Sequence, residues 1–385
     1  DMSRGLGDVY KRQRDSHVPW WYRESDPAEE REFTTAEAFP GLNLMTGFGA
    51  DDSLVARITD MEGNDVHRWT IDWFELWPEP DHLSPLNGLI PKTRPGTFIH
   101  GAALTTEGDL VFNFEYLGLV RLDPCGNVVW RLPYPTHHSV HIDEDDTIWV
   151  SGRRNHYEED PRFTNYKPHF FEPTVLQVSP DGEILQEISI LEVFQASPYA
   201  GMLYLRTRAH DSSEVTGDVM HLNDVEPFPA SMEPGFFDEG DVAVSLRNIN
   251  TVLVFDSNTR DIKFLRTGQF IRQHDPDFID GNSLSIFDNN NNVGNWRTGS
   301  SQILLFTADE EKPRVIYKGD QDRPFYTSIM GKHQWLANGN ILITESRMGR
   351  AMEINPAGEI VWQLYNRVND NQVGWLTDAQ RIPLE

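Results

Sequence analysis

Short apolar stretches, separated by tight turns, recur along the whole chain. The clearest copies run from Asp123 to Trp130, from Ser179 to Leu185 and from Asn355 to Trp362, with a looser copy from Met61 to Trp69. The clear copies place Gly after a Pro or Asp, which favours a tight hairpin turn. The β-branched and aromatic residues that follow favour a strand. This pattern predicts the outer hairpin of a repeated β-sheet unit.

A second pattern precedes the first and begins with a histidine. Its copies start at His100, His138, His274 and His333, and a fifth copy with a longer turn starts at His221. In the first three copies the same number of residues separates the histidine from the first apolar residue of the next strand. A strand, a turn and a second strand fit this spacing.

The two patterns together predict an all-β chain, a six-bladed β-propeller with short helical and loop insertions. A four-stranded blade takes about 40–50 residues. Radial repetition also explains how many short strands avoid a long exposed edge. The unit from Gly41 to Trp73 lacks the histidine but fits the strand pattern. The units begin near residues 41, 98, 136, 219, 272 and 330.

Three segments fall outside the repeats. Residues 76–96 are rich in proline and predict a connecting loop. Residues 154–173 combine aromatic and charged side chains and predict an insertion. Residues 190–204 have apolar positions at mixed helical spacing, which predicts a short helix over one face.

The first residues do not resemble a natural protein start. Residues 8–13, DVYKRQ, are what a transposon mosaic-end adapter encodes, so we interpret residues 1–13 as a sequencing-adapter artefact of metagenomic origin. Residues 14–40 then form an N-terminal segment, and we expect residues 41–385 to form a single propeller domain. A signal peptide lost by truncation is compatible with this start.

Composition limits the partners of the chain. The formal net charge is −27, which repels phosphate backbones, so we expect no nucleic acid partner. We find no apolar run of about 18 residues, so no membrane span is predicted. Cys125 is the single cysteine, which leaves no internal disulfide and no thiolate metal cluster. The oligomeric state and the compartment stay open on this evidence.

Histidines that occupy the same position in several blades are predicted to line one rim of the central channel. One such histidine alone is ordinarily bonded to a neighbouring loop, but five at one rim indicate a site. Arginines follow the second strand of several units and are expected near the histidines: Arg153, Arg154, Arg247, Arg297, Arg347 and Arg350. Neutral imidazoles with guanidinium groups form a positive island, which suits a sulfate, phosphate or carboxylate group.

A histidine-rich channel allows three kinds of chemistry. Three imidazoles can hold zinc, and a metal hydrolase would then contain the metal. The central set has no HxH or HExxH pair, and His138 and His141 fall on opposite strand faces, so we predict no metal and no cofactor. Histidine can also attack phosphorus or sulfur and carry the group covalently. The third possibility is ligand binding without catalysis.

Three segments resemble the arylsulfotransferase family: residues 221–256, residues 272–289 and residues 331–362. The likeness covers roughly residues 98–366. It implies a six-bladed propeller that moves a sulfuryl group from an aryl sulfate to a phenol, without a nucleotide sulfate donor. It further implies a sulfohistidine intermediate, two other histidines and an arginine in the site, and a periplasmic or secreted location.

The resemblance assigns roles residue by residue. His221 matches the family's HxN histidine, His274 matches the QHD histidine, and His333 matches the nucleophile by its order along the chain. The family's Ser-Arg pair reads Ser301-Gln302 here, and the nearest arginine is Arg297. The substrate-binding residues that we predict are Arg297, Arg247, Arg347, His138 and His100.

Two functional hypotheses follow. The first is an enzyme whose partners are a small-molecule aryl sulfate and a phenol. The second is a non-catalytic propeller that binds an anionic or aromatic ligand, or a protein partner, at the channel mouth. Convergence of three histidines on one small anion would favour the first hypothesis.

Overall fold

The structure, a computed structural model, describes residues 19–26, 31–86, 88–207, 213–292 and 299–384. These residues belong to two compact units, each described by itself below. The central unit comprises residues 73–92 and 99–328. The terminal unit comprises the described residues up to 72, together with 93–98 and 329 onwards. The predicted adapter segment, residues 1–13, lies outside the described residues.

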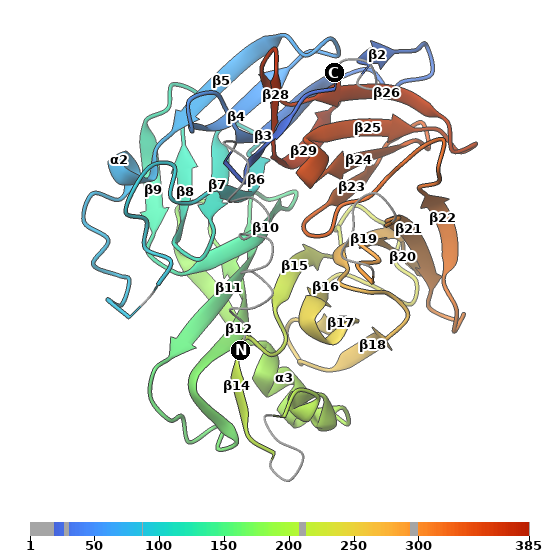
Figure 1. Ribbon diagram of the computed structural model, residues 1–385. Coiled ribbons are helices and arrows are strands. Elements are labelled where there is room, and N and C mark those ends of the chain that lie inside the picture. The colour runs from blue at the N-terminus through green and yellow to red at the C-terminus, as the bar shows by residue number, and fades with distance from the viewer. Residues whose placement is uncertain (1–18, 27–30, 87, 208–212, 293–298, 385) are drawn as a thin grey trace. The chain divides into compact units, whose positions relative to one another are not determined.

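The central unit is a series of four antiparallel sheets that follow one another along the chain (Figure 1). The first contains β6 (Ile99–Leu104), β7 (Leu110–Phe114), β8 (Gly118–Leu122) and β9 (Val128–Leu132). The second contains β10 (Thr136–Ile142), β11 (Ile148–His156), β12 (Tyr166–Val178) and β13 (Ile184–Ser189), and β14 (Val215–Gly217) is added in parallel beside β12. The third contains β15 (Leu222–Pro227), β16 (Asp241–Leu246), β17 (Thr251–Asp256) and β18 (Ile262–Thr267). The fourth contains β19 (His274–Asp280), β20 (Ser283–Asp288), β21 (Gln302–Thr307) and β22 (Arg314–Lys318).

The terminal unit contains three sheets. In one, β29 (Leu376–Ile382) pairs with β3 (Leu42–Phe48), which is followed by β4 (Leu54–Thr59) and β5 (Asp65–Ile71). In another, β23 (Lys332–Trp335), β24 (Ile341–Glu345), β25 (Arg350–Ile354) and β26 (Ile360–Tyr365) are extended by β2 (Phe33–Thr34). The smallest contains β1 (Tyr22–Glu24), β28 (Gln372–Gly374) and β27 (Arg367–Asn369). The first of these sheets therefore combines strands from both ends of the chain.

Burial falls from the first strand to the last strand of a sheet. All residues of β7 and β8 are buried, whereas most residues of β9 and β22 are exposed. Strands that are buried on both faces read as continuous apolar runs, and half-exposed strands alternate. This gradient is what a blade requires when its inner strands are enclosed by neighbouring blades and its last strand faces solvent.

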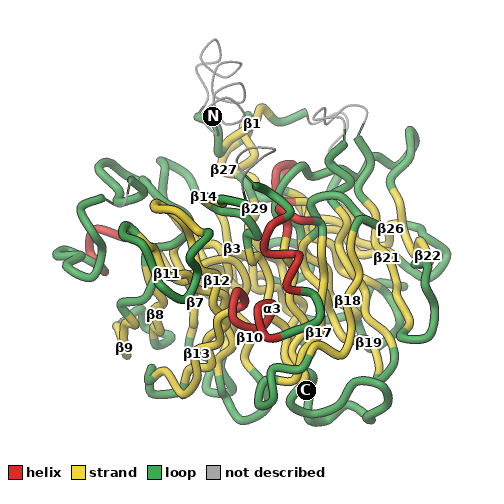
Figure 2. The backbone as a smooth tube through the Cα atoms, turned by 90° about the horizontal axis from the view of Figure 1, so that it is seen from below, coloured by secondary structure: helices red, strands yellow, loops and turns green. Residues whose placement is uncertain are grey.

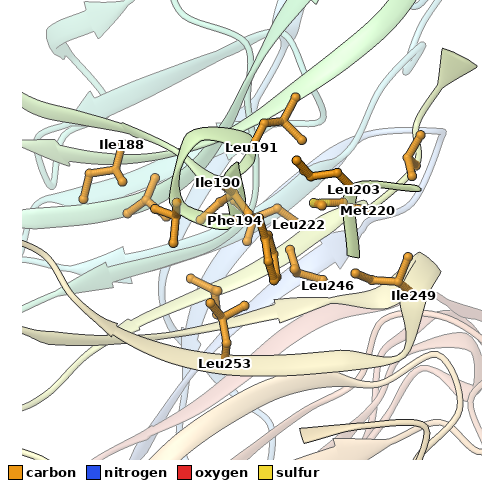
Figure 3. Packing of buried hydrophobic residues seen from close by; sticks show 14 of the residues in the cluster. Ile188, Ile190, Leu191, Phe194, Leu203, Met220, Leu222, Leu246, Ile249 and Leu253 are labelled. Carbon is orange, nitrogen blue, oxygen red and sulfur yellow. The ribbon is translucent and has the colours of Figure 1, made fainter. Parts of the chain in front are cut away.

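A large apolar cluster ties the second and third sheets of the central unit together. Helix α3 (Ile190–Ala196) begins at Ser189, whose hydroxyl accepts a hydrogen bond from the Glu192 N–H, and buries Ile190, Leu191, Val193 and Phe194. Figure 3 shows Phe194 among Leu222, Leu246 and Leu253 of the third sheet. Full burial of each such side chain contributes about 1.5–3 kcal/mol.

Several predicted elements are confirmed. The turns after Asp123, Ser179 and Asn355 join the third and fourth strands of their sheets, as the outer-hairpin pattern predicts. The helix expected over 190–204 is present as α3 and the 3-10 helix Ala200–Tyr204. One interpretation needs refinement: the insertion over 154–173 is in large part a continuation of β11 and β12. These strands therefore pair well beyond the ordinary blade, out to His156 and Phe170.

The chain is thus an all-β protein of the propeller class, with few and short helices (Figure 2). The expected total of six blades and the expected single domain over 41–385 stay predictions. Within the ranges that the structure describes, we find no helix of the length and apolar character needed to cross a membrane.

Candidate functional site: a histidine cluster with flanking arginines

Four of the predicted histidines lie at the beginning of the first strand of their sheets in the central unit. His100 is the second residue of β6, His138 lies at a bulge in β10, His221 directly precedes β15, and His274 is the first residue of β19. These four strands are in contact in the order in which they occur along the chain: β6 lies beside β10, β10 beside β15 and β15 beside β19. The repeat pattern therefore brings the histidines to one place.

The imidazole rings are in contact with one another. The centroid of the His138 ring lies 3.7 Å from that of His100, 5.1 Å from that of His221 and 6.1 Å from that of His274. His137 joins them, because its Nδ1 lies 2.7 Å from Nδ1 of His138. All five rings are nearly or fully buried. His138 is the centre of this histidine cluster.

The backbone is strained where two of these histidines are presented. His138 has φ 56° and His221 has φ 55°, a left-handed conformation that costs a non-glycine residue about 1–3 kcal/mol. Gly101 permits the close approach of β6 to β10, since a Cβ at this position would lie 2.0 Å from the His138 carbonyl oxygen. Asn113 Nδ2 donates to the same carbonyl at 3.1 Å, which fixes the peptide in place.

The tautomer of His274 is set by its neighbours. Its Nδ1 lies 2.6 Å from Asn289 Oδ1 and 3.1 Å from the Arg272 carbonyl oxygen, both hydrogen-bond acceptors. Asn289 is oriented by its own Nδ2, which donates to the Thr327 carbonyl at 2.9 Å. Nδ1 of His274 therefore carries the proton. Burial, followed by the charge of Arg247, lowers the pKa of His274 to about 3, so its Nε2 holds a free lone pair.

His221 has the same arrangement with a stronger partner. Its Nδ1 donates to the Asp218 carboxylate, three residues earlier in the chain. Burial and the charge of Arg247 lower the pKa of His221, and together they outweigh the opposite effect of Asp218. Burial raises the pKa of Asp218, but His221, Arg153 and Arg247 together lower it by more. The net pKa lies below its ordinary value, so the carboxylate is ionised. Nε2 of both His221 and His274 is buried and has no hydrogen-bond partner within the described part of the chain.

Burial, together with neighbouring charges, lowers the pKa of the remaining histidines and keeps them uncharged. Burial, then the neighbouring imidazoles, lower the pKa of His100 and of His138 well below its ordinary value. The pKa of His137 is lowered first by burial and then by Arg153. The cluster is thus a set of neutral imidazoles at physiological pH, and any fixed positive charge comes from arginine.

Arg247 is the predicted arginine that the structure places at the cluster. It begins the short 3-10 helix Arg247–Ile249 after β16, and its N–H donates to the His221 carbonyl at 3.0 Å. Its Nε is buried without a hydrogen-bond partner among the described residues. Its charge affects the pKa of His100, His221 and His274 in the same direction. Together with Arg153, this forms a positive island in an acidic protein.

The other predicted residues belong to the terminal unit or fall outside the described ranges. His333 is buried in β23 and Arg347 in the 3-10 helix Ser346–Met348 contacts Trp375, with 5.0 Å from its guanidinium carbon to the ring centroid. Both belong to the terminal unit. Arg297 lies outside the described residues. Gln302 begins β21 and donates through Nε2 to Asp288 Oδ2 at 2.8 Å.

Three residues of the cluster were not predicted from the sequence: His137, Asp218 and Asn289. A signal existed for two of them, since His137 directly precedes His138 and Asp218 lies three positions before His221. Asn289 reaches the cluster from the end of another strand, and single-sequence patterns do not reveal such contacts. Arg153 is one of the arginines that the sequence pattern places near the histidines.

A second group of possible metal ligands has a structural explanation. Suitable ligand atoms of His156, Asp160 and Glu172 lie within 4.8 Å of one another. Arg162 Nη2 already contacts Asp160 at 2.7 Å and the fully buried Glu172 at 3.0 Å, and His156 Nε2 lies 2.7 Å from Glu172. A cation here would have to compete with arginine, so we interpret the group as an ion-pair network at the base of the long hairpin.

Glu115 provides a pH-dependent charge beside the two arginines. Burial raises the pKa of Glu115 to about 7, although Arg153 and Arg247 oppose this. The carboxyl is neutral below pH 7 and negative above it, where it offsets part of the arginine charge. We expect the affinity for inorganic sulfate to fall about 3- to 10-fold between pH 6 and pH 8. Glu115→Gln, measured by calorimetry, should largely remove this dependence, and an unchanged dependence would contradict the assignment.

The repeated four-stranded β fold defines a propeller-class protein, and the buried cluster of neutral imidazoles flanked by arginine is its candidate site. A family model described as Arylsulfotransferase (ASST) matches residues 100–367. The chain therefore belongs to the arylsulfotransferase family and has an arylsulfotransferase-like function, with small molecules as substrates. No curated protein sequence matches the chain.

Solved structures of low sequence identity are similar in fold. A protein of unknown function from Bacteroides caccae aligns with a TM-score of 0.50 and 12% identity, over 87% of this chain and 98% of that chain. Virginiamycin B lyase from Staphylococcus aureus aligns with a TM-score of 0.40 and 9% identity, over 92% and 99%. A chain of a nidogen–laminin complex aligns with a TM-score of 0.46 and 8% identity, over 84% and 94%. At these identities the likeness concerns the fold alone.

Proposed function

We propose that this protein transfers a sulfuryl group from an aryl sulfate to a phenolic acceptor through a sulfohistidine intermediate. The observation that carries the proposal is the pair His221 and His274. Each has Nδ1 held by an acceptor and Nε2 buried without a hydrogen-bond partner among the described residues, beside the charge of Arg247. The family membership supports the same chemistry.

The free lone pairs suit proton transfer from the acceptor. A histidine nitrogen attacks sulfur, an N–S bond forms, and the S–O bond to the aryl group breaks, so that a phenolate leaves. The acceptor phenol then gives its proton to Nε2 of His221 or His274, and its oxygen attacks sulfur while the N–S bond breaks. The protonated imidazole returns its proton to the phenolate of the next donor. Protons and electron pairs balance over the full cycle.

We propose His333 as the nucleophile, on the resemblance of residues 331–362 to the family. His333 lies in β23 and is 6% exposed. Substrate oxygens would be bound by the remaining predicted residues: Arg247, Arg297, Arg347, His138 and His100. Arg247 has direct support from its charge at the cluster.

Trapping of the intermediate tests the proposal. The protein is incubated with 4-nitrophenyl sulfate without an acceptor, digested under alkaline conditions and examined by mass spectrometry. We expect release of 4-nitrophenolate and one sulfuryl group on the peptide that contains His333. A sulfuryl group on His221 or His274 would reassign the nucleophile. Absence of both modification and transfer to added phenol would leave the non-catalytic, ligand-binding function.

A further inference from the structure

Arg153 occupies an unusual position for a buried arginine. It lies in β11, is 8% exposed, and is stacked between two rings, with its guanidinium carbon 3.6 Å from the Tyr116 ring centroid and 4.0 Å from that of Phe171. Such stacking stabilises the cation. The N–H edge of the guanidinium is the part that can form hydrogen bonds.

That edge has no carboxylate to bind within the ranges that the structure describes. Nε of Arg153 is buried and has no hydrogen-bond partner there. Other buried arginines are paired: Arg121 binds Asp109 at 2.8 Å, and Arg381 binds Glu353 at 3.0 Å. Because a buried charge ordinarily requires a partner, Arg153 is a cation held in place for a group that arrives from outside.

Arg153 lies beside the histidine cluster, because the ring that it stacks on is itself in contact with two of the histidines. Tyr116, which covers one face of the guanidinium, has its ring centroid 4.5 Å from that of His137 and 6.4 Å from that of His138. Tyr116 has φ 60°, so the backbone is strained at the residue whose ring stacks on the arginine. The charge of Arg153 also lowers the pKa of His137 and His221, as expected for a guanidinium close to both rings.

We infer that Arg153 is a second anion-binding residue of this site and that, with Arg247, it binds the oxygens of a sulfate ester. The planar guanidinium edge matches two oxygens of a tetrahedral anion. The identity of the anion rests on the proposed function, whereas the existence of the anion site does not. Gln302, which stands where the family's arginine is expected, is bonded to Asp288 and supplies no charge.

The lone pairs on His221 and His274 strengthen this assignment. Two neutral imidazoles that present lone pairs repel the oxygens of an anion, so donors must come from another source. Arg153 on β11 and Arg247 after β16 both influence the pKa of His221 and Asp218, so the two guanidinium groups flank this pair. Sulfate would therefore be bound by arginine edges, with the imidazoles left free for proton transfer.

Arg153→Met tests the assignment, because the thioether keeps contact with both rings but removes the charge. We expect inorganic sulfate, measured by calorimetry, to bind about 10- to 100-fold more weakly, which is about 1.4–2.7 kcal/mol. KM for 4-nitrophenyl sulfate should rise by a similar factor. The matched control is Arg154→Met in the same strand, since Arg154 pairs with Glu187 at 2.6 Å and Glu172 at 3.2 Å. This control should bind sulfate as the parent does.

The outcomes separate the two proposals. Sulfate binding that depends on Arg153, without any sulfuryl transfer by the parent, would support the anion site and reject the proposed reaction. Equal sulfate affinity in the parent and in a folded Arg153→Met variant would overturn the role of Arg153, whatever the activity. If that variant does not fold, Arg153→Lys replaces it; the point charge lacks the two-donor edge, and affinity equal to the parent's would again overturn the inference.

Discussion

Replacement of His221 by alanine is expected to lower kcat/KM for sulfuryl transfer by about 10²- to 10⁴-fold, the usual contribution of a general base. The reason is that Nε2 of His221 is a buried lone pair, neutral at physiological pH and held in one tautomer by the Asp218 carboxylate. The measurement is steady-state transfer from 4-nitrophenyl sulfate to a phenol. The matched control is His141→Gln, because His141 lies in β10 like His138 but pairs with Glu226 at 2.6 Å.

Asp218→Asn distinguishes a proton-transfer role from a structural one. Asp218 raises the pKa of His221, so its neutralisation lowers that pKa further. A base must be unprotonated to act, and the rate therefore declines as pH falls through its pKa. We expect the variant to have a lower maximal rate and an acidic limb displaced to lower pH. A lower rate with an unmoved limb would indicate that Asp218 only supports the fold.

Arg381→Met is expected to lower the free energy of unfolding by about 3–5 kcal/mol, the usual cost of leaving a buried charge without its partner. Arg381 in β29 donates through Nε to Asn43 Oδ1 at 2.8 Å and through Nη1 to Glu353 Oε2 at 3.0 Å, and the ion-paired side chains are fully buried. Its guanidinium also stacks on Trp362, 4.9 Å from the ring centroid. Denaturant unfolding followed by tryptophan fluorescence measures the change.

Two variants check this explanation. Arg381→Met combined with Glu353→Gln removes the unpaired carboxylate, so we expect it to recover a substantial part of the lost stability. Arg367→Met breaks the partly exposed pair with Glu32, at 3.1 Å, and should change stability by about 0–1 kcal/mol. Equal losses for Arg381→Met and Arg367→Met would show that burial of the Arg381 pair has no special effect.

The repeats made much of the β structure predictable. A turn dipeptide before β-branched residues is a local signal, and the turns after Asp123, Ser179 and Asn355 lie where this signal places them. The extension of β11 and β12 was not predictable in the same way. Residues 154–173 carry charged and aromatic side chains that resemble a loop, and they form a hairpin because Arg154, Arg162 and His156 satisfy the buried Glu172.

The site was predictable where it depends on repetition and unpredictable where it depends on contacts between sheets. His100, His138, His221 and His274 share one position in consecutive units, so their convergence follows from the pattern. Arg153 also follows from the pattern of arginines on second strands, whereas Asn289, which orients His274, follows the second strand of another sheet without such a pattern. No local pattern in one sequence indicates which side chains meet in that way.

The pairing of β29 with β3 joins segments that are far apart in the chain. Asn43 and Arg381, partners in the register of these strands, are 338 residues apart. Until β29 pairs with it, β3 presents an unpaired row of N–H and C=O groups, to which other extended segments can add. Completion of this sheet requires closure of a very long loop, which is intrinsically slow. The folding chain therefore passes through a state in which this edge of β3 is unpaired. A chaperone or a misfolded neighbour would bind at this edge.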